Sequence, residues 1–184
     1  MGSIDLRTVQ IADGSNCVIR TAGPEDATET LKMYQSVVAE GRLTLIGPEE
    51  LHRTIEEEAE AVRDRVKNPQ ELQVVAEVDG RIVGTATVEG GSTAITSHFG
   101  DIANVWVRSE LRGLGIGGYM MNGLVEWSRQ HPNLEKLGLL VFSTSTAAIA
   151  LYASVGFRIE GTSKGDMKFG ANDYADTVYM GLWL

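Results

Sequence analysis

The sequence predicts an α/β (α+β) domain built on a single mixed, mostly antiparallel sheet of about six or seven strands, flanked by about four helices. Two observations predict this class. Short strand-like runs alternate with segments of helical periodicity, in the order β, α, α, β, β, β, α, β, α, β, β. The chain has 184 residues, 43% of them hydrophobic, which suits one globular domain. We expect an N-terminal extension over residues 1–15 and one domain over residues 16–184.

The domain begins with a strand and a helix. Cys17-Val18-Ile19-Arg20 is typical of a strand. Gly23-Pro24-Glu25-Asp26 then starts a helix, because proline suits the first turn and acidic residues favour the positive end of the helix dipole. Gly41 ends this helix, and residues 42–47 are expected to form a loop.

A second helix is expected to follow Pro48 and to end at Asn68-Pro69. Its apolar residues recur at steps of three and four, which predicts one buried stripe made of Leu51, Ile55, Ala59, Val62 and Val66. The acidic run Glu56-Glu57-Glu58 suggests a metal or catalytic cluster at first sight. We interpret it instead as a solvated helix face paired with Arg53, Arg63 and Arg65.

A β-hairpin follows over residues 72–89. Asp79-Gly80 marks its two-residue turn, since both positions favour the left-handed backbone that such turns need. The remaining elements are expected to be a strand within 98–108, a helix over 114–130, a strand over 137–142, a helix over 146–154, and strands over 157–160 and 174–184.

Charge and composition exclude several classes of function. The net charge is −9, which argues against nucleic-acid binding and against anchoring to anionic lipid. Cys17 is the only cysteine, and His52, His98 and His131 form no local motif, so we expect no disulfide and no metal. The chain shows neither an apolar run long enough for a membrane helix nor a secretory signal. We therefore expect a cytoplasmic protein.

The most informative segment is a glycine cluster between a predicted strand and a predicted helix, Arg112-Gly113-Leu114-Gly115-Ile116-Gly117-Gly118. Glycines let a ligand approach the backbone closely, and a helix N-terminus presents unpaired N–H groups with a partial positive charge. Together they predict an anion site suited to phosphate, with Arg112 as a forked cationic donor beside it.

A glycine cluster of this kind also occurs in two nucleotide-binding motifs and in purely structural turns. Gly113, Gly115 and Gly118 satisfy the dinucleotide-binding pattern G-x-G-x-x-G, but that pattern belongs directly after the first strand of a βαβ unit. Here Ser109-Glu110-Leu111-Arg112 intervenes and several strands precede it. A P-loop fails because no Gly-Lys-Ser/Thr follows. In the remaining alternative, a purely structural turn, the glycines would only allow neighbouring elements to pack closely.

The same residues resemble a known family. Arg112-Gly-Leu-Gly115-Ile-Gly117 is similar to the R/Q-x-x-G-x-G/A pattern of the GNAT superfamily of acyl-CoA N-acyltransferases. Downstream, Ala148-Ile-Ala-Leu151-Tyr152-Ala-Ser-Val-Gly156-Phe157 resembles the family's A-I-x-L-Y-x-x-x-G-F segment. The two motifs stand in the right order, and the element order from Val18 to Leu184 fits the fold. The resemblance therefore implies a central pair of parallel, splayed strands in the sheet.

The resemblance also implies acetyl-CoA (coenzyme A) as co-substrate. In the family the pyrophosphate lies on the amides of the glycine turn, and the pantetheine arm runs between the splayed strands, here those holding Val107 and Leu139. Ser145 stands where the family often has asparagine, and it keeps the ability to hydrogen-bond the cofactor. The cofactor-binding residues implied are Val105, Trp106, Val107, Arg112, Gly113, Leu114, Gly115, Ile116, Gly117, Gly118, Ser145 and Tyr152.

The implied reaction is direct attack of a neutral amine on the thioester. Tyr152 occupies the family's position for the acid that protonates the leaving thiolate, and a backbone N–H near Val107 would stabilise the oxyanion. Asp101 stands six residues before Val107, where some members carry a base that acts through water. His98 and water itself remain alternative bases, and Asn104 could only position substrate.

The acceptor is the least defined part. The resemblance places its site between residues 38–51 and 162–176, and it implies an acyltransferase acting on a primary amine. We expect a small molecule or an amino acid; a protein N-terminus, a lysine, or an acyl-CoA sensor with little turnover are the alternatives. The expected partners are this amine and a second copy of the chain as a homodimer, with no nucleic acid and no membrane.

Overall fold

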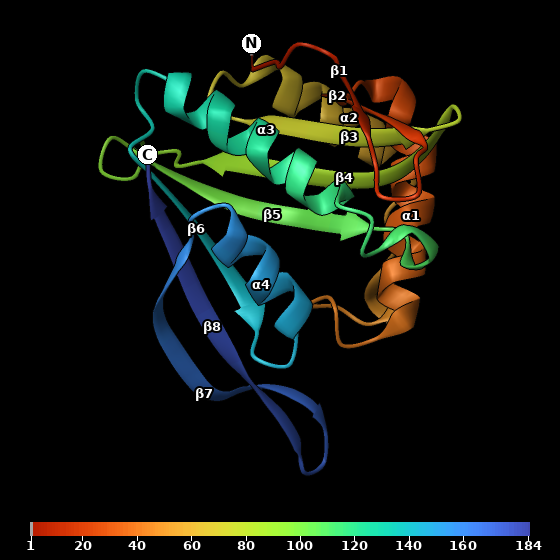
Figure 1. Ribbon diagram of the computed structural model, residues 1–184. Coiled ribbons are helices and arrows are strands. Elements are labelled where there is room, and N and C mark those ends of the chain that lie inside the picture. The colour runs from red at the N-terminus through yellow and green to blue at the C-terminus, as the bar shows by residue number, and fades with distance from the viewer. Residues whose placement is uncertain (1) are drawn as a thin grey trace.

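A computed structural model describes residues 2–184, and eight strands of this part of the chain form one mixed sheet (Figure 1). Their spatial order is β1-β2-β3-β4-β5-β6-β8-β7, and only the neighbours β5 and β6 run parallel. The predicted fold class is confirmed, with one strand more than expected. The strands are β1 (Arg7–Gln10), β2 (Asn16–Thr21), β3 (Leu72–Val78), β4 (Arg81–Gly90), β5 (Phe99–Val107), β6 (Lys136–Phe142), β7 (Arg158–Gly170) and β8 (Asp173–Trp183).

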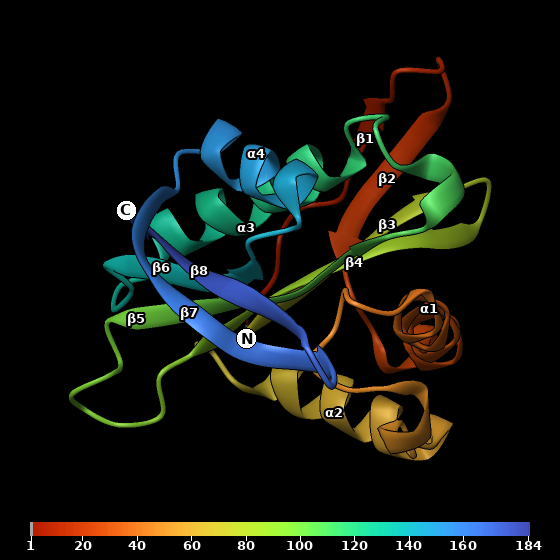
Figure 2. The ribbon, with the colours of Figure 1, turned by 90° about the horizontal axis from the view of Figure 1, so that it is seen from below.

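Within the described part of the chain, four α-helices cover the sheet on both faces. Figure 2 shows α3 and α4 on one face and α1 and α2 on the other. The helices are α1 (Ala27–Glu40), α2 (Ile55–Lys67), α3 (Ile116–Gln130) and α4 (Thr146–Ser154), with short 3-10 turns at Pro24–Asp26, Pro48–Glu50 and Ser109–Leu111. No helix within residues 2–184 combines the length and the apolar character needed to cross a membrane.

The core is divided by the sheet. Val74 and Val75 are neighbours on β3, and because successive strand side chains point to opposite faces they join different clusters. Val74 packs in the larger cluster beneath α3, with Met120 and Leu124 of that helix. Val75 packs in the smaller cluster beneath α1 and α2. The helices on each face of the sheet therefore pack against a separate apolar cluster.

The second helix begins later than the sequence predicted. It starts at Ile55 rather than after Pro48, because Thr54 and Glu57 form a capping box that fixes the helix start there. Leu51 consequently lies outside the helix. The acidic run is also not wholly solvated, since Glu58 is 7% exposed and pairs with Arg53.

The last hairpin is longer than predicted. The strand expected over 157–160 extends from Arg158 to Gly170 and pairs along its length with β8. Residues 161–170 are mostly glycine and polar, which is more typical of a loop. Their strand conformation comes from backbone hydrogen bonds to β8, which the apolar pattern of β7 does not encode.

Candidate functional site

The two parallel strands at the centre of the sheet diverge. β5 and β6 pair only over Phe99–Asp101 and Lys136–Gly138. Beyond these residues β5 continues to Val107 alongside β4, whereas β6 continues to Phe142 alongside β8. The facing edges of β5 and β6 therefore carry backbone N–H and C=O groups that the ladder between them does not use. Such an edge suits an extended, amide-containing ligand that adds to it as a strand would.

β5 carries an irregularity within this opening. Its register with β4 shifts between Thr85, which pairs with Trp106, and Thr87, which pairs with Ala103. The additional residue on β5 is accommodated by Asn104, whose φ is +53°. A bulge of this kind turns backbone groups away from the ladder. The two residues of β5 without a register partner on β4 are Asn104 and Val105.

The glycine cluster forms the end of the opening. Gly113 and Gly115 have φ of +80° and +91°, which L-residues with side chains rarely adopt, and α3 begins directly afterwards at Ile116. A Cβ on Gly113 would meet no atom within 4 Å, so the loop surface is open there. The first N–H groups of α3 have no acceptors within the helix. The loop therefore fits the phosphates of the co-substrate that the resemblance implies.

The two motifs of the sequence meet at one contact. A Cβ placed on Gly117 would lie 3.0 Å from Cδ2 of Leu151, so any larger residue there would force the Leu151 side chain to shift. Leu151 precedes Tyr152 on α4. The glycine turn and the tyrosine are thus held on adjacent helices by direct packing.

Arg112 does not face an open site. Its guanidinium donates to both carboxylate oxygens of Glu40 at 2.6 and 2.7 Å, and its Nε donates to the carbonyl of Val107 at 2.9 Å. Glu40 is the last residue of α1. Arg112 therefore links the glycine loop both to the end of β5 and to the helix pair on the other face. A ligand anion would have to compete with Glu40 for this cation.

Tyr152 is buried between α4 and the sheet, with 8% of its surface exposed. Its ring packs at 6.2 Å from that of Phe157. Burial raises the pKa of Tyr152 to about 12, because the phenolate would lose its hydration. The hydroxyl is therefore protonated at neutral pH and can act as an acid. Ser145, at the N-cap of α4, is half-buried, and its amide donates to the carbonyl of Phe142.

Asp101 lies at the point where β5 and β6 separate, directly opposite Glu89 of β4. Loss of hydration and the nearby charge of Glu89 raise the pKa of Asp101 to about 6. This value suits a group that gains and loses a proton near neutrality. His98 precedes β5, and its carbonyl accepts hydrogen bonds from the amides of Glu135 and Lys136.

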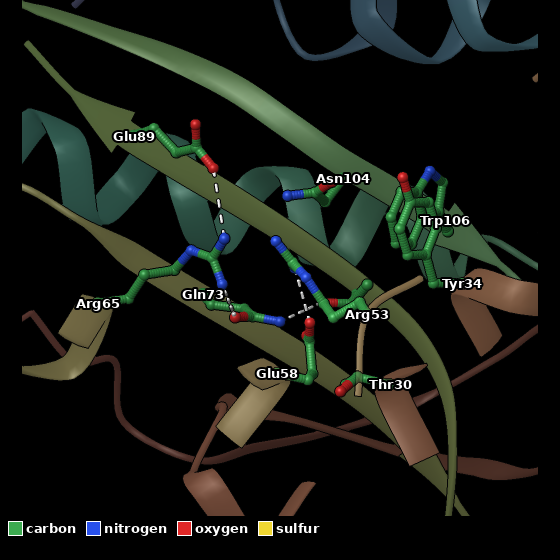
Figure 3. A pocket seen from close by; sticks show the side chains of 10 residues that line it. Thr30, Tyr34, Arg53, Glu58, Arg65, Gln73, Glu89, Asn104 and Trp106 are labelled. Atoms are coloured by element: carbon green, nitrogen blue, oxygen red, sulfur yellow. Dashed lines mark hydrogen bonds and ion pairs between the residues drawn. The ribbon is translucent and has the colours of Figure 1, made fainter. Parts of the chain in front are cut away.

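On the face covered by α1 and α2, a pocket of about 250 Å³ reaches the bulge of β5. Its walls come from both helices and from the segment before α2, and its floor comes from β3, β4 and β5. Its lining consists of Thr30, Tyr34, Arg53, Glu58, Arg65, Gln73, Thr85, Glu89, Asn104 and Trp106. Figure 3 shows these side chains converging from the helices and the sheet. Tyr34 stacks on Trp106 at 4.4 Å and forms an aromatic end to an otherwise polar pocket.

The segments that the resemblance assigned to the acceptor lie together. Arg42, in the loop after α1, forms an ion pair with Asp173 and lies 5.0 Å from the ring of Phe169, both on the β7–β8 hairpin. None of the residues that line the pocket on the α1–α2 face lies within 38–51 or 162–176. In the sequence, Arg65 and Gln73 resemble ordinary residues of a helix surface and a strand. Their polarity within otherwise apolar stripes was the signal that could have revealed them.

Comparison with known proteins identifies the family that this chain's sequence matches. The sequence model that describes the acetyltransferase (GNAT) family matches residues 40–157 of this chain. The chain is 31% identical over 108 residues to the L-amino acid N-acetyltransferase AaaT of Escherichia coli (strain K12), and the match covers 59% of this chain. It spans 65% of that curated relative, slightly less than two thirds of its length.

Solved structures share the fold over nearly the whole chain. A GNAT-family acetyltransferase from Streptococcus pneumoniae has a TM-score of 0.86 and 24% identity, covering 91% of this chain and 99% of its own. The structure of yncA from Salmonella typhimurium with its cofactor acetyl-CoA has a TM-score of 0.81 and 20% identity, covering 92% of this chain and 94% of its own.

Proposed function

The chain belongs to the acetyltransferase (GNAT) family, and from this premise we propose that it transfers an acetyl group from acetyl-CoA to a primary amine. The acceptor is a small molecule or an amino acid, and the amine attacks directly within a ternary complex. One observation carries the proposal. The bulge of β5 borders both the opening between β5 and β6 and the pocket on the α1–α2 face, so that two substrates can meet there from opposite faces.

The residues proposed to hold acetyl-CoA are those of the opening and its end. The backbone of Val105, Trp106 and Val107 would pair with the amides of the pantetheine arm. The amides of residues 113–118 would bind the pyrophosphate, and Arg112 would exchange Glu40 for it. Ser145 and Tyr152 would complete the site from α4. When bound, acetyl-CoA would supply, as a thioester, the acetyl group that is transferred.

Three events in the reaction would use the protein's own groups: removal of the amine proton, stabilisation of the carbonyl oxygen, and protonation of the departing sulfur. Asp101 would accept the proton of the incoming amine through water, with His98 or water alone as alternatives. A backbone N–H at the bulge would stabilise the negative charge that develops on the carbonyl oxygen. Tyr152 would give its proton to the departing sulfur. The new bond joins the amine nitrogen to the acetyl carbon, and the bond between that carbon and sulfur breaks.

Direct attack is favoured over an acyl-enzyme by the position of the only cysteine. Cys17 has no solvent exposure, and burial is the largest cause that raises the pKa of its thiol. A buried, protonated thiol cannot accept the acetyl group. Initial rates measured against both substrates should therefore give intersecting double-reciprocal lines, and parallel lines would contradict the ternary complex.

The experiment that tests the function has two stages. Thermal melts with acetyl-CoA, CoA and NAD should show stabilisation by the two CoA species only. Release of free thiol is then followed with panels of amines, amino acids, peptides carrying a free N-terminus, and peptides carrying only a lysine amine. Small amines or amino acids are expected to stimulate release. Stimulation by peptides alone would assign the acceptor to proteins, and CoA binding without release would identify a sensor.

The cytoplasmic location and the homodimer stay predictions. The acidic composition suits a cytoplasmic protein, and exposed apolar side chains on β7 and β8, namely Ile159, Tyr179 and Trp183, favour a second copy as partner. Light scattering at several concentrations measures the mass directly. A monomer at all concentrations would overturn the homodimer.

A further inference from the structure

One cation in the pocket, Arg65, has a fixed position but uses few of its hydrogen-bond donors. Arg65, in the last turn of α2, has only 14% of its side chain exposed. Within residues 2–184, its guanidinium makes one hydrogen bond, from Nη1 to Oε1 of Gln73 at 3.1 Å. The carboxylate of Glu89 stands 3.6 Å from Nη2, beyond a good hydrogen bond. A guanidinium has five N–H donors, so Arg65 retains the capacity to bind a carboxylate with two parallel bonds.

The orientation of Arg65 is fixed from the sheet. Gln73 is buried on β3, and its Nε2 donates to Oγ1 of Thr85 at 3.2 Å. Thr85 on β4 in turn donates to the carbonyl of Val74 at 3.0 Å. Because this relay leaves Gln73 only its carbonyl oxygen for Arg65, the guanidinium is directed before any ligand arrives (Figure 3). A preoriented donor loses little conformational entropy on binding.

The other cation of the pocket is paired more closely than Arg65, whose ion pair with Glu89 is 3.6 Å long. Arg53 donates to Glu58 at 2.8 Å, and that carboxylate is 9% exposed. Its charge is therefore neutralised at close range by a buried partner. Arg65 is the better candidate for an incoming anion, and the pair of Arg53 and Glu58 forms the wall beside it.

Acidic groups stand on β4, next to Arg65, and on the neighbouring strand β5. Glu89 lines the pocket next to Arg65, and Asp101 stands directly across the strand pair from Glu89. The pocket thus presents a cation on α2 and a carboxylate on β4, and the carboxylate of Asp101 stands on β5 opposite Glu89, outside the pocket lining. This order of charges complements a molecule that carries a carboxylate and an amine a few bonds apart. A volume of about 250 Å³ also limits the acceptor to a small molecule.

We propose that the acceptor is a free α-amino acid, that Arg65 binds its α-carboxylate, and that its amine is thereby directed toward the bulge of β5. This inference rests on the proposed acetyl transfer and specifies its substrate class. It separates free amino acids from protein N-termini, whose α-carboxyl group is already an amide and carries no charge. Arg65 would thus determine specificity, whereas the proton transfers remain with other residues.

Matched acceptors test the inference. L-Phenylalanine, L-leucine and L-glutamate are each compared with their α-carboxamides and with the corresponding amines that lack the α-carboxyl group. In the wild type we expect kcat/KM for at least one free acid to exceed that of its carboxamide by about 10- to 100-fold, the usual range for charge-assisted hydrogen bonds. In Arg65→Gln this ratio should fall below about threefold, mainly through a higher KM for the acid.

Arg63→Gln is the matched control, since it removes the same charge from an exposed position on the same helix. It should leave the ratio unchanged. Arg65→Lys, which keeps the charge but not the forked donor, should give an intermediate ratio and keeps the test valid if Arg65→Gln fails to fold. A carboxamide as good as the free acid in the wild type, or an equal loss on both in Arg65→Gln, would overturn the inference.

A binding measurement separates this inference from the proposed function. Calorimetry follows the same acids and carboxamides titrated into the protein with CoA present. If no amine is acetylated but the acids still bind more tightly through Arg65, acetyl transfer fails and the carboxylate site stands. If amines are acetylated with no preference for a carboxylate, the function stands and the carboxylate site fails.

Discussion

Arg112, beside the glycine loop, is joined to Glu40, the last residue of α1, by two short hydrogen bonds of 2.6 and 2.7 Å. The contact connects the two faces of the sheet. α1 provides part of the pocket, through Thr30 and Tyr34, whereas Arg112 belongs to the loop proposed to bind phosphate. If Arg112 exchanged Glu40 for a phosphate, the C-terminal end of α1 would lose this contact. α1 also lines the proposed acceptor pocket.

Replacing Glu40 tests this exchange. Glu40→Gln removes the competing charge, so we expect acetyl-CoA to bind about two to five times more tightly, the range of a partly exposed ion pair. Calorimetry with acetyl-CoA measures the Kd. Glu56→Gln, which removes an exposed charge from α2, should leave the Kd unchanged. Weaker binding in Glu40→Gln would instead show that Glu40 positions Arg112 for the ligand.

The conformation of the glycine loop leads to a second prediction. Valine at position 115 would have to adopt a φ near +91°, which costs about 1–2 kcal/mol, and its side chain would fill the proposed phosphate cradle. Gly115→Val should therefore weaken acetyl-CoA binding at least 100-fold. Gly165→Val is the control, because Gly165 also has a positive φ, +63°, but lies on β7. Unchanged affinity in Gly115→Val would remove the cradle from this loop.

Tyr152 should affect the reaction rate and not the binding of the co-substrate. Tyr152→Phe keeps the buried ring but removes the proton donor, so we expect kcat to fall about 10²- to 10⁴-fold. The Kd for acetyl-CoA should change less than threefold. Stopped-flow or steady-state thiol release and calorimetry measure the two quantities. Wild-type kcat in this variant would show that another group protonates the thiolate.

Asp101 should determine the acidic limb of the pH profile. A base with a pKa of about 6 must be ionised to act, so kcat/KM should rise between pH 5 and 7 and then level off. Asp101→Asn should lower the plateau and abolish this limb. A limb that persists unchanged in the variant would assign the base to His98 or to water.

The same residue predicts a pH-dependent change in stability. The folded pKa of about 6 lies above the ordinary value of 3.8, so the fold favours protonated Asp101 and disfavours the ionised form. The stability associated with the protonated form is complete below pH 3.8 and is lost as the pH rises through 6. Asp101→Asn should therefore have a higher Tm than the wild type at pH 8 and an equal Tm near pH 3.5. A lower Tm at pH 8 would contradict the raised pKa.

From the sequence, it was possible to place the part of the proposed site that depends on local backbone chemistry. The glycine turn could be placed because Gly113 and Gly115 adopt positive φ. Backbone positions with positive φ favour glycine, so they are visible in the sequence itself. Tyr152 could be placed because its motif lies on one short helix. The capping box of Thr54 and Glu57 was equally local, yet the proline before it suggested an earlier and incorrect helix start.

The acceptor pocket could not be derived in this way, because its residues are far apart in the sequence. Arg65, Gln73 and Thr85 come from a helix and two strands, and each alone resembles an ordinary polar surface residue. The partner of Arg112 was likewise invisible, since Glu40 is 72 residues away.

The sequence by itself thus determined most of the order of the elements and the phosphate-type turn, since these follow from periodicity and from backbone propensities within short segments. The role proposed for Tyr152 came from the resemblance to the family. Only the tertiary structure located the point at which the expected splayed strands separate, after Asp101, and showed that the bulge at Asn104 faces the pocket and that a preoriented arginine lies within it. These features depend on which strands become neighbours and on which side chains share a buried face, and such relations arise only when the sheet is assembled.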